Sequence, residues 1–185
     1  MLERKHLTME ELEAGLETLR QSPKDEGVLE FIVRRPQIGA REVLEEGELD
    51  LVEGLMGDNW RTRGSSRTAD GTSHPDMQLN VMNARMIALV AQAKERWQLA
   101  GDQLFVDLDL SVDNVPPGTR LALGSAVIVV TDQPHTGCKK FVERFGAEAL
   151  KFVNSAVGKQ LQLRGINARV VHPGVMRVGD VVKKL

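Results

Sequence analysis

From residue 28 to the C-terminus, the apolar residues of this chain fall into short runs that end at glycine or proline turn signals. Within 104–110 every second residue is Leu or Val, which is the period of a half-buried strand, and 126–131 is a nearly continuous apolar run. Further strand candidates lie at 28–33, 77–81, 119–123, 161–163, 166–171 and 178–182. Many short strands with a few helices between them predict a mainly β, α+β fold: a β-barrel decorated by short helices.

The N-terminal segment has the features of an amphipathic helix. Thr8 and Glu11 have the spacing of a capping box, and three leucines repeat at helical spacing from Leu12. We therefore divide the chain into an N-terminal helix within residues 1–27 and a barrel domain over residues 28–185. The helix is expected to serve in packing or in the formation of a homodimer.

Two helical regions are expected inside the barrel domain. Asn83 is placed to cap a helix that extends to Gly101, and apolar residues recur at helical spacing after residue 138, with Gly146 as a break between two short helices. The segment 41–52 has the pattern of a hairpin around Gly47.

A long polar segment follows at residues 61–76, where the only apolar residues are one alanine and one proline. A loop of this length is typical of a functional lid or of a disordered segment. Arg61, Arg63 and Arg67 would give it an anion-binding side.

Composition excludes several classes of protein. The chain is 42% hydrophobic and 27% charged, and it has no run approaching the ~20 apolar residues that span a bilayer. The charged N-terminus has no apolar stretch of the kind found in secretory signals. With 4% aromatic residues the chain has few side chains for stacking on nucleic-acid bases. A single cysteine fits a reducing compartment, so we expect a cytoplasmic protein with neither membrane nor nucleic acid as partner.

The C-terminal third is basic although the whole chain has a net charge of −2. Residues 134–185 contain ten Lys and Arg against three Asp and Glu. This asymmetry indicates either a solvated basic face or a site for a small anionic ligand.

Cys138 is the strongest candidate for a functional residue. It follows a buried strand and begins a helix, and its neighbours His135, Lys139 and Lys140 are not those of an apolar core. The positive end of the helix and the two lysines would stabilise a thiolate, which is the reactive and metal-binding form. The alternative is a small buried side chain that only packs.

The order of these features resembles the MOSC domain, which is named for the C-terminal domain of molybdenum-cofactor sulfurases. The resemblance is carried by the buried strand and Cys138, and then by Lys140-Phe141, Arg144-Phe145-Gly146, 163–171, Pro173-Gly174 and Gly179-Asp180. It extends upstream to the turns of 112–124 and to Gly57-Asp58, although Asn59 follows where the family commonly has a histidine.

The resemblance implies a β-barrel that binds a molybdenum–pterin cofactor, with Cys138 as metal ligand or sulfur carrier. By their charge and position, we expect His135 and four basic residues to surround the cofactor and its phosphate: Lys139, Lys140, Arg164 and Arg169. The activity would be cofactor or sulfur transfer, or reduction of N-hydroxylated substrates with a separate electron-donor protein. The alternative hypothesis is a non-catalytic barrel that binds an anionic metabolite or a protein, in which Cys138 is structural.

Overall fold

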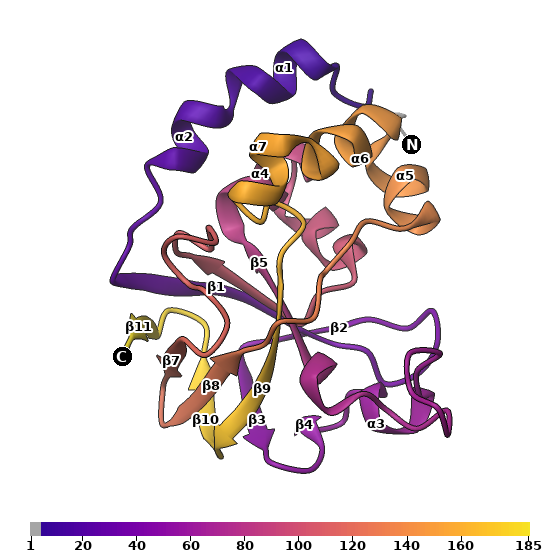
Figure 1. Cartoon of the computed structure of the whole chain (residues 1–185), viewed down its shortest axis with the longest axis vertical. Coiled ribbons are helices and arrows are strands. Elements are labelled where there is room, and N and C mark those ends of the chain that lie inside the picture. The colour runs from indigo at the N-terminus through magenta and orange to yellow at the C-terminus, as the bar shows by residue number, and fades with distance from the viewer. Residues whose placement is uncertain (1–4) are drawn as a thin grey trace.

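The computed structural model describes residues 5–185, and a closed β-barrel is its main feature (Figure 1). In the described part of the chain, seven strands form the ring in the order β11-β7-β8-β9-β5-β6-β1, and β1 pairs back with β11. The strands are β1 (Glu26–Arg34), β5 (Leu79–Asn83), β6 (Leu104–Asp107), β7 (Arg120–Leu123), β8 (Ala126–Val130), β9 (Ile166–His172) and β11 (Val181–Lys184). The predicted barrel is therefore confirmed.

The ring is antiparallel except where β5 runs parallel to β6. The register shifts in β1 between Leu29 and Phe31 and in β8 between Val127 and Ile128. Such bulges bend and twist a strand, which helps a sheet to close on itself.

A small second sheet joins β10 (Gly174–Arg177), β3 (Glu46–Asp50) and β4 (Gly54–Leu55). The predicted hairpin over 41–52 is wrong, because β2 (Glu42–Leu44) pairs with β1 whereas β3 pairs with β10 and β4. The chain changes sheets at Glu45, and Gly47 lies inside β3 rather than in a turn.

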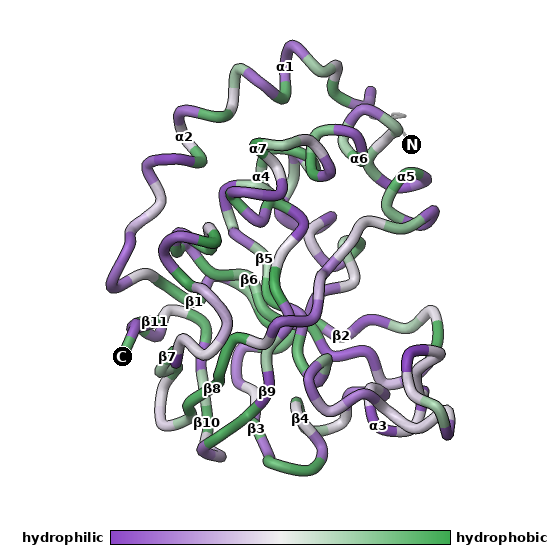
Figure 2. The backbone as a smooth tube through the Cα atoms, viewed as in Figure 1, coloured by the Kyte–Doolittle hydropathy of each residue, from purple (hydrophilic) through white to green (hydrophobic). Residues whose placement is uncertain are grey.

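The barrel has two hydrophobic cores, one inside the ring and one beneath the helices. Figure 2 shows the apolar stretches along the barrel strands and in the helices above them. Leu104 and Val106 belong to the inner core, whereas Phe105 belongs to the outer core with Phe31 and Trp97. The rings of Phe31 and Trp97 meet edge to face at a centroid distance of 5.7 Å. The strand β6 is therefore covered on both faces over these residues, not on one face as its alternation predicted.

Four helices and one 3₁₀ helix cover one end of the barrel, whereas α3 (Trp60–Arg63) lies toward the other end (Figure 1). The covering helices are α4 (Ala84–Ala91), α5 (Lys139–Phe145), α6 (Ala147–Asn154) and α7 (Ala156–Gln160), with the 3₁₀ helix η2 (Lys94–Ala100). The side chain of Asn83 caps α4, and Gly146 separates α5 from α6, as predicted. The predicted helix to Gly101 is instead divided at Gln92, whose backbone is left-handed with φ of 60°. The predicted strand at 161–163 is a turn after α7.

The N-terminal segment forms two helices, α1 (Met9–Ala14) and α2 (Leu16–Arg20), rather than one. The capping box of Thr8 and Glu11 is present, and Leu12 is fully buried against the helical layer. The division falls at Gly15, where an added Cβ would lie 2.7 Å from the Leu89 side chain of α4. Residues 1–4 of the predicted N-terminal segment lie outside the described residues.

Residues 64–74 of the polar segment 61–76 form the loop between α3 and the 3₁₀ helix η1 (Pro75–Met77). The Thr68 hydroxyl oxygen lies within hydrogen-bond distance of two carbonyl oxygens of this loop, that of Ser65 at 3.0 Å and that of Thr72 at 2.6 Å. In residues 5–185 we find no helix with the length and apolar character needed to cross a membrane.

Candidate functional site

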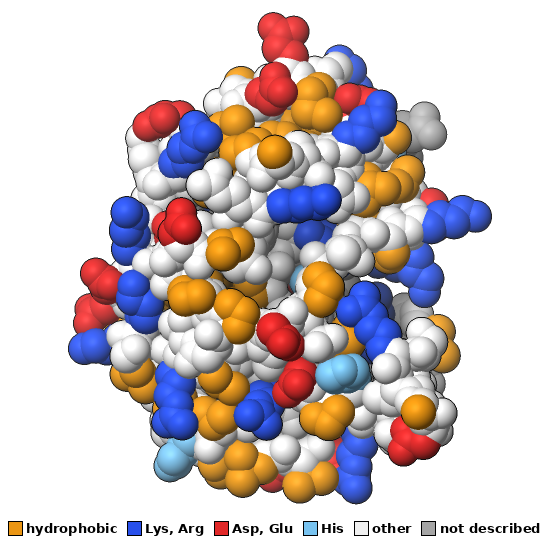
Figure 3. All heavy atoms as spheres, viewed as in Figure 1, with side chains coloured by type: hydrophobic (Ala, Val, Ile, Leu, Met, Phe, Trp, Pro, Cys, Tyr) orange, Lys and Arg blue, Asp and Glu red, His pale blue; other side chains and the backbone are white. Residues whose placement is uncertain are grey.

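A cavity of about 570 Å³ opens beside α5 and the segment that connects β1 to β2. Basic side chains gather there, on the right-hand side of Figure 3. We call it the cationic pocket, because seven basic residues and no Asp or Glu line it among the described residues. The basic residues are Arg35, Arg41, Arg63, Lys139, Lys140, Arg144 and Arg164.

Arg35 is a fixed part of the pocket wall. Its Nε lies 2.9 Å from Asp58 Oδ1 and its Nη2 lies 2.8 Å from Asp58 Oδ2, so the two side chains form a bidentate pair. Both are almost fully buried, with exposed side-chain fractions of 5% and 0%. Asp58 of the Gly57-Asp58 motif therefore neutralises this arginine rather than facing the pocket.

A second buried carboxylate, Asp102, joins two predicted site residues. Its Oδ2 accepts a hydrogen bond from Arg164 Nη1 and its Oδ1 lies next to His135 Nε2, each at 2.7 Å. Arg164 Nη2 also donates to the Ala100 carbonyl, and its guanidinium lies over the Phe141 ring. Arg164 is thus held in place by this chain's own residues.

The electrostatics of this cluster fix its protonation. Burial alone would raise the pKa of Asp102, but the charge of Arg164 and the contact with His135 outweigh it and lower the pKa. Burial and the Arg164 charge lower the pKa of His135, against the opposing effect of Asp102. His135 is therefore neutral at pH 7, and its Nε2–H donates to the Asp102 carboxylate.

The other basic residues of the pocket have no carboxylate within ion-pair distance in the described part of the chain. Arg41 and Arg144 both extend to Gly101, since each has a guanidinium nitrogen within about 4 Å of the point where Gly101 would carry a Cβ. Burial, then the charges of Arg144 and Arg35, lowers the pKa of Arg41. Uncompensated like charges of this kind favour an anionic ligand.

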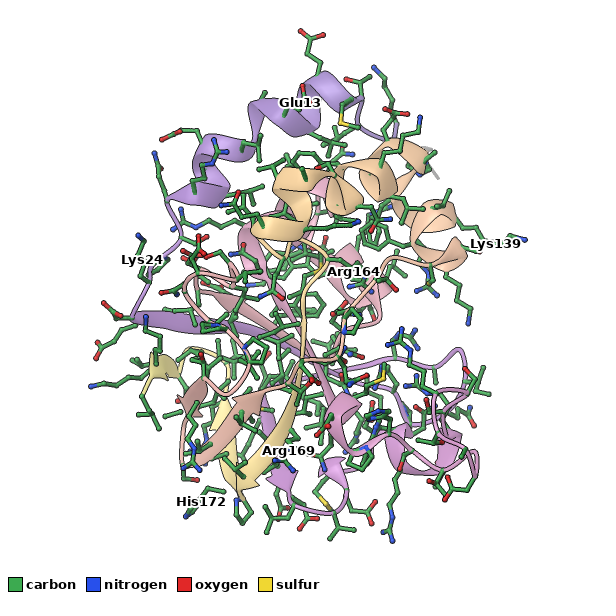
Figure 4. The ribbon with its side chains drawn as sticks, in the orientation of Figure 1. Glu13, Lys24, Lys139, Arg164, Arg169 and His172 are labelled. Carbon is green, nitrogen blue, oxygen red and sulfur yellow. The ribbon has the colours of Figure 1, made fainter. Side chains whose placement is uncertain are left out.

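Cys138 is exposed and directly precedes α5. It lines the cationic pocket together with His135, Lys139, Lys140 and Arg164, so five of the six predicted site residues lie together. Figure 4 shows the Lys139 side chain pointing away from the protein and Arg164 lying inside it.

Arg169 does not line this pocket. It lies on β9 with a half-exposed side chain, and its Nε is 3.7 Å from Asp76 Oδ1. Arg169 was predicted as a cofactor-binding residue from its charge, but charge alone does not indicate which way a strand residue points.

Four residues line the pocket without having been predicted there: Arg35, Arg41, Arg144 and Asn59. The pairing of Asp102 with His135 was not predicted either. Three of these features had a signal: Arg35 ends a strand at a proline step, Arg144 was part of the family resemblance, and Asn59 follows the Gly57-Asp58 motif. Arg41 and Asp102 had none. In residues 5–185, no three His, Cys, Asp or Glu side chains form a metal-binding group.

The position of Cys138 predicts that its thiol reacts in the folded protein. We expect iodoacetamide to modify Cys138 completely under native conditions, with little acceleration when urea unfolds the chain, because the thiol already meets solvent. Mass spectrometry over time measures this directly. Modification that requires unfolding would show instead that the cysteine is a packing residue.

The chain is thus a closed barrel with an exposed thiol at a cationic pocket. Residues 68–183 match the model of the MOSC domain, and the chain therefore belongs to the MOSC domain family. No curated protein matches the chain significantly.

Solved structures share the fold. The YUAD protein from Bacillus subtilis superposes with a TM-score of 0.64 at 14% identity, over 86% of this chain and 95% of that one. YiiM from Escherichia coli superposes with a TM-score of 0.53 at 22% identity, over 85% of this chain and 69% of that one. YiiM from Geobacillus stearothermophilus superposes with a TM-score of 0.52 at 14% identity, over 89% of this chain and 74% of that one. At these identities the likeness concerns the fold alone.

Proposed function

We propose that the cationic pocket binds a molybdenum–pterin cofactor, with Cys138 as a ligand of the metal or as a carrier of its sulfur. The observation that carries this proposal is that the exposed thiol shares one cavity with basic side chains that lack carboxylate partners among residues 5–185. A thiolate is a soft ligand suited to such a metal, and guanidinium groups match the oxygens of a phosphate.

The pocket fits a ligand of this kind in size and in chemistry. Its volume of about 570 Å³ lies within the range of sites for small molecules and cofactors. Three lining side chains each have a buried polar atom without a hydrogen-bond partner: Arg41 Nε, Asn59 Oδ1 and Arg164 Nε. Buried polar groups are normally satisfied, so these atoms favour a polar occupant.

We assign the phosphate to Arg41, Arg63, Arg144 and Lys140, which line the pocket without carboxylate partners in the described residues. Arg164 would support the wall instead, since Asp102 and Ala100 already bind its outer nitrogens. When bound, the cofactor would supply two-electron redox chemistry or a transferable sulfur, and this chain's residues would bind and orient it.

The reaction would be cofactor or sulfur transfer, or reduction of an N-hydroxylated substrate. For reduction, a separate electron-donor protein would provide the electrons, and for transfer, a sulfur-transfer protein would be the partner. We place the protein in the cytoplasm, where a lone thiol stays reduced.

Removing one arginine from the pocket tests the proposal. In a host that makes the cofactor, we expect Arg144→Gln to retain pterin and molybdenum tenfold to about a hundredfold more weakly, because a charge-assisted hydrogen bond contributes about 1.5–3 kcal/mol. Dialysis followed by metal and pterin analysis measures the retention.

Arg169→Gln is the matched control, because it removes the same charge from outside the pocket. Equal retention in both variants would contradict the assignment of the phosphate. A folded wild type that retains neither pterin nor metal would favour the alternative, a barrel that binds another anionic metabolite.

A further inference from the structure

The cationic pocket is rich in hydrogen-bond donors, and its buried acceptors are few. Arginine and lysine side chains only donate, and seven residues of these two types are among those that line the cavity. Two lining side chains that are buried or nearly so have an acceptor atom with no partner among residues 5–185. They are His135 and Asn59.

His135 presents its acceptor because Asp102 fixes the tautomer. With Nε2–H donated to Asp102 Oδ1, the lone pair of the neutral ring is on Nδ1, which forms no hydrogen bond to a described residue. The side chain is only 13% exposed. A Cβ at Gly165 would lie 2.9 Å from His135 Cδ2 and 3.3 Å from Asp102 Oδ1, so this glycine leaves room for the pair.

Asn59 provides a second acceptor atom that has no hydrogen-bond partner in the described part of the chain. The residue is 8% exposed, its Oδ1 is buried without a partner, and its side-chain amide forms no hydrogen bond within residues 5–185. Its own backbone is used, since its N–H donates to the Arg35 carbonyl at 2.8 Å and its carbonyl accepts from Arg63. The backbone therefore holds in place a side-chain amide that has no hydrogen-bond partner among residues 5–185.

We propose that His135 and Asn59 are the specificity-determining acceptors of this pocket. They accept hydrogen bonds from N–H groups of a heterocyclic ligand, while the arginines bind its anionic group. The inference deepens the proposed function and rests on it, because it assigns these acceptors to the donor-bearing pterin ring. A flat anion without N–H donors satisfies the arginines and leaves both acceptors unused.

Two fluorescent probes separate these contributions in the cofactor-free protein. Pterin-6-carboxylate has a carboxylate and N–H donors, whereas 2-naphthoate has a carboxylate on a flat ring without such donors. We expect wild type to prefer pterin-6-carboxylate, and His135→Phe or Asn59→Leu to weaken its binding about tenfold each, which is the effect of one lost hydrogen bond. Binding of 2-naphthoate should change less than twofold.

His135→Gln keeps a side-chain acceptor and should recover most of the affinity lost in His135→Phe. If one variant fails to fold, as judged by its thermal melt, the other still tests the inference. Equal weakening of both probes, or no weakening of either, would overturn it and leave the proposed function standing. A wild type that binds 2-naphthoate as tightly as pterin-6-carboxylate, or neither probe, would overturn both.

Discussion

Asp58→Ala should destabilise the protein by about 3–5 kcal/mol, the usual effect of removing one partner from a buried ion pair. The Asp58 carboxylate binds Arg35 through two side-chain hydrogen bonds and also accepts from the Arg35 and Trp60 backbone N–H groups, at 2.8 and 3.1 Å. Without it, the Arg35 guanidinium remains buried and uncompensated. Urea unfolding of wild type and variant measures the difference in free energy.

Asp107→Ala is the matched control for this prediction. Asp107 also forms a bidentate contact with an arginine, Arg85, but both side chains are about one-quarter exposed. Solvent screens such a pair, and we expect a loss of about 1 kcal/mol or less. A similar loss in the two variants would mean that the burial of Asp58 is not what makes the pair important.

Asp102→Asn should have an effect of similar size, about 3–5 kcal/mol at pH 7, because the fully buried carboxylate compensates Arg164 and binds His135. The substitution keeps the shape of the side chain and removes its charge. Chemical unfolding again measures the loss, and a loss below about 1 kcal/mol would contradict the role given to Asp102.

The pH dependence of stability gives a second measurement on the same cluster. The pKa of His135 is lower in the folded than in the unfolded protein, so the unfolded state binds the proton more readily. This contribution is complete above the unfolded value of about 6.5 and is lost as the pH falls from there through the lower folded value. The lowered pKa of Asp102 acts in the same direction at lower pH, through the unfolded value of about 3.9 and below. We therefore expect His135→Gln to reduce the pH dependence of the free energy of unfolding near and below pH 6.5, and to leave the dependence due to Asp102 at lower pH unchanged.

The barrel could be predicted because its strands are marked by local patterns. The runs at 126–131 and 166–171 and the turn residues around them are enough to place β8 and β9. The division of a helix at Gln92 could not be predicted in the same way, because a left-handed residue other than glycine has no local signal. The change of sheet at Glu45 depends on pairing with β10, more than 120 residues away.

The candidate site was predictable where it lies on one segment. His135, Cys138 and Lys140 are close in sequence, and the loop before α5 keeps them together. Arg41 and Arg144 come from distant segments, and only the closed barrel brings them to the wall at Gly101. Arg169 has the same charge as these residues, but its side chain lies outside the pocket.

The most direct test of the proposed function is the molybdenum and pterin content of the purified wild type and of Cys138→Ala, both expressed in a host that makes the cofactor. We expect near-stoichiometric metal and pterin in wild type, and a variant that folds equally well but contains no molybdenum, because the thiolate is proposed as a ligand of the metal. Equal molybdenum in the two proteins would contradict the role of Cys138 as a ligand of the metal, and a folded wild type without molybdenum or pterin would contradict the proposal as a whole.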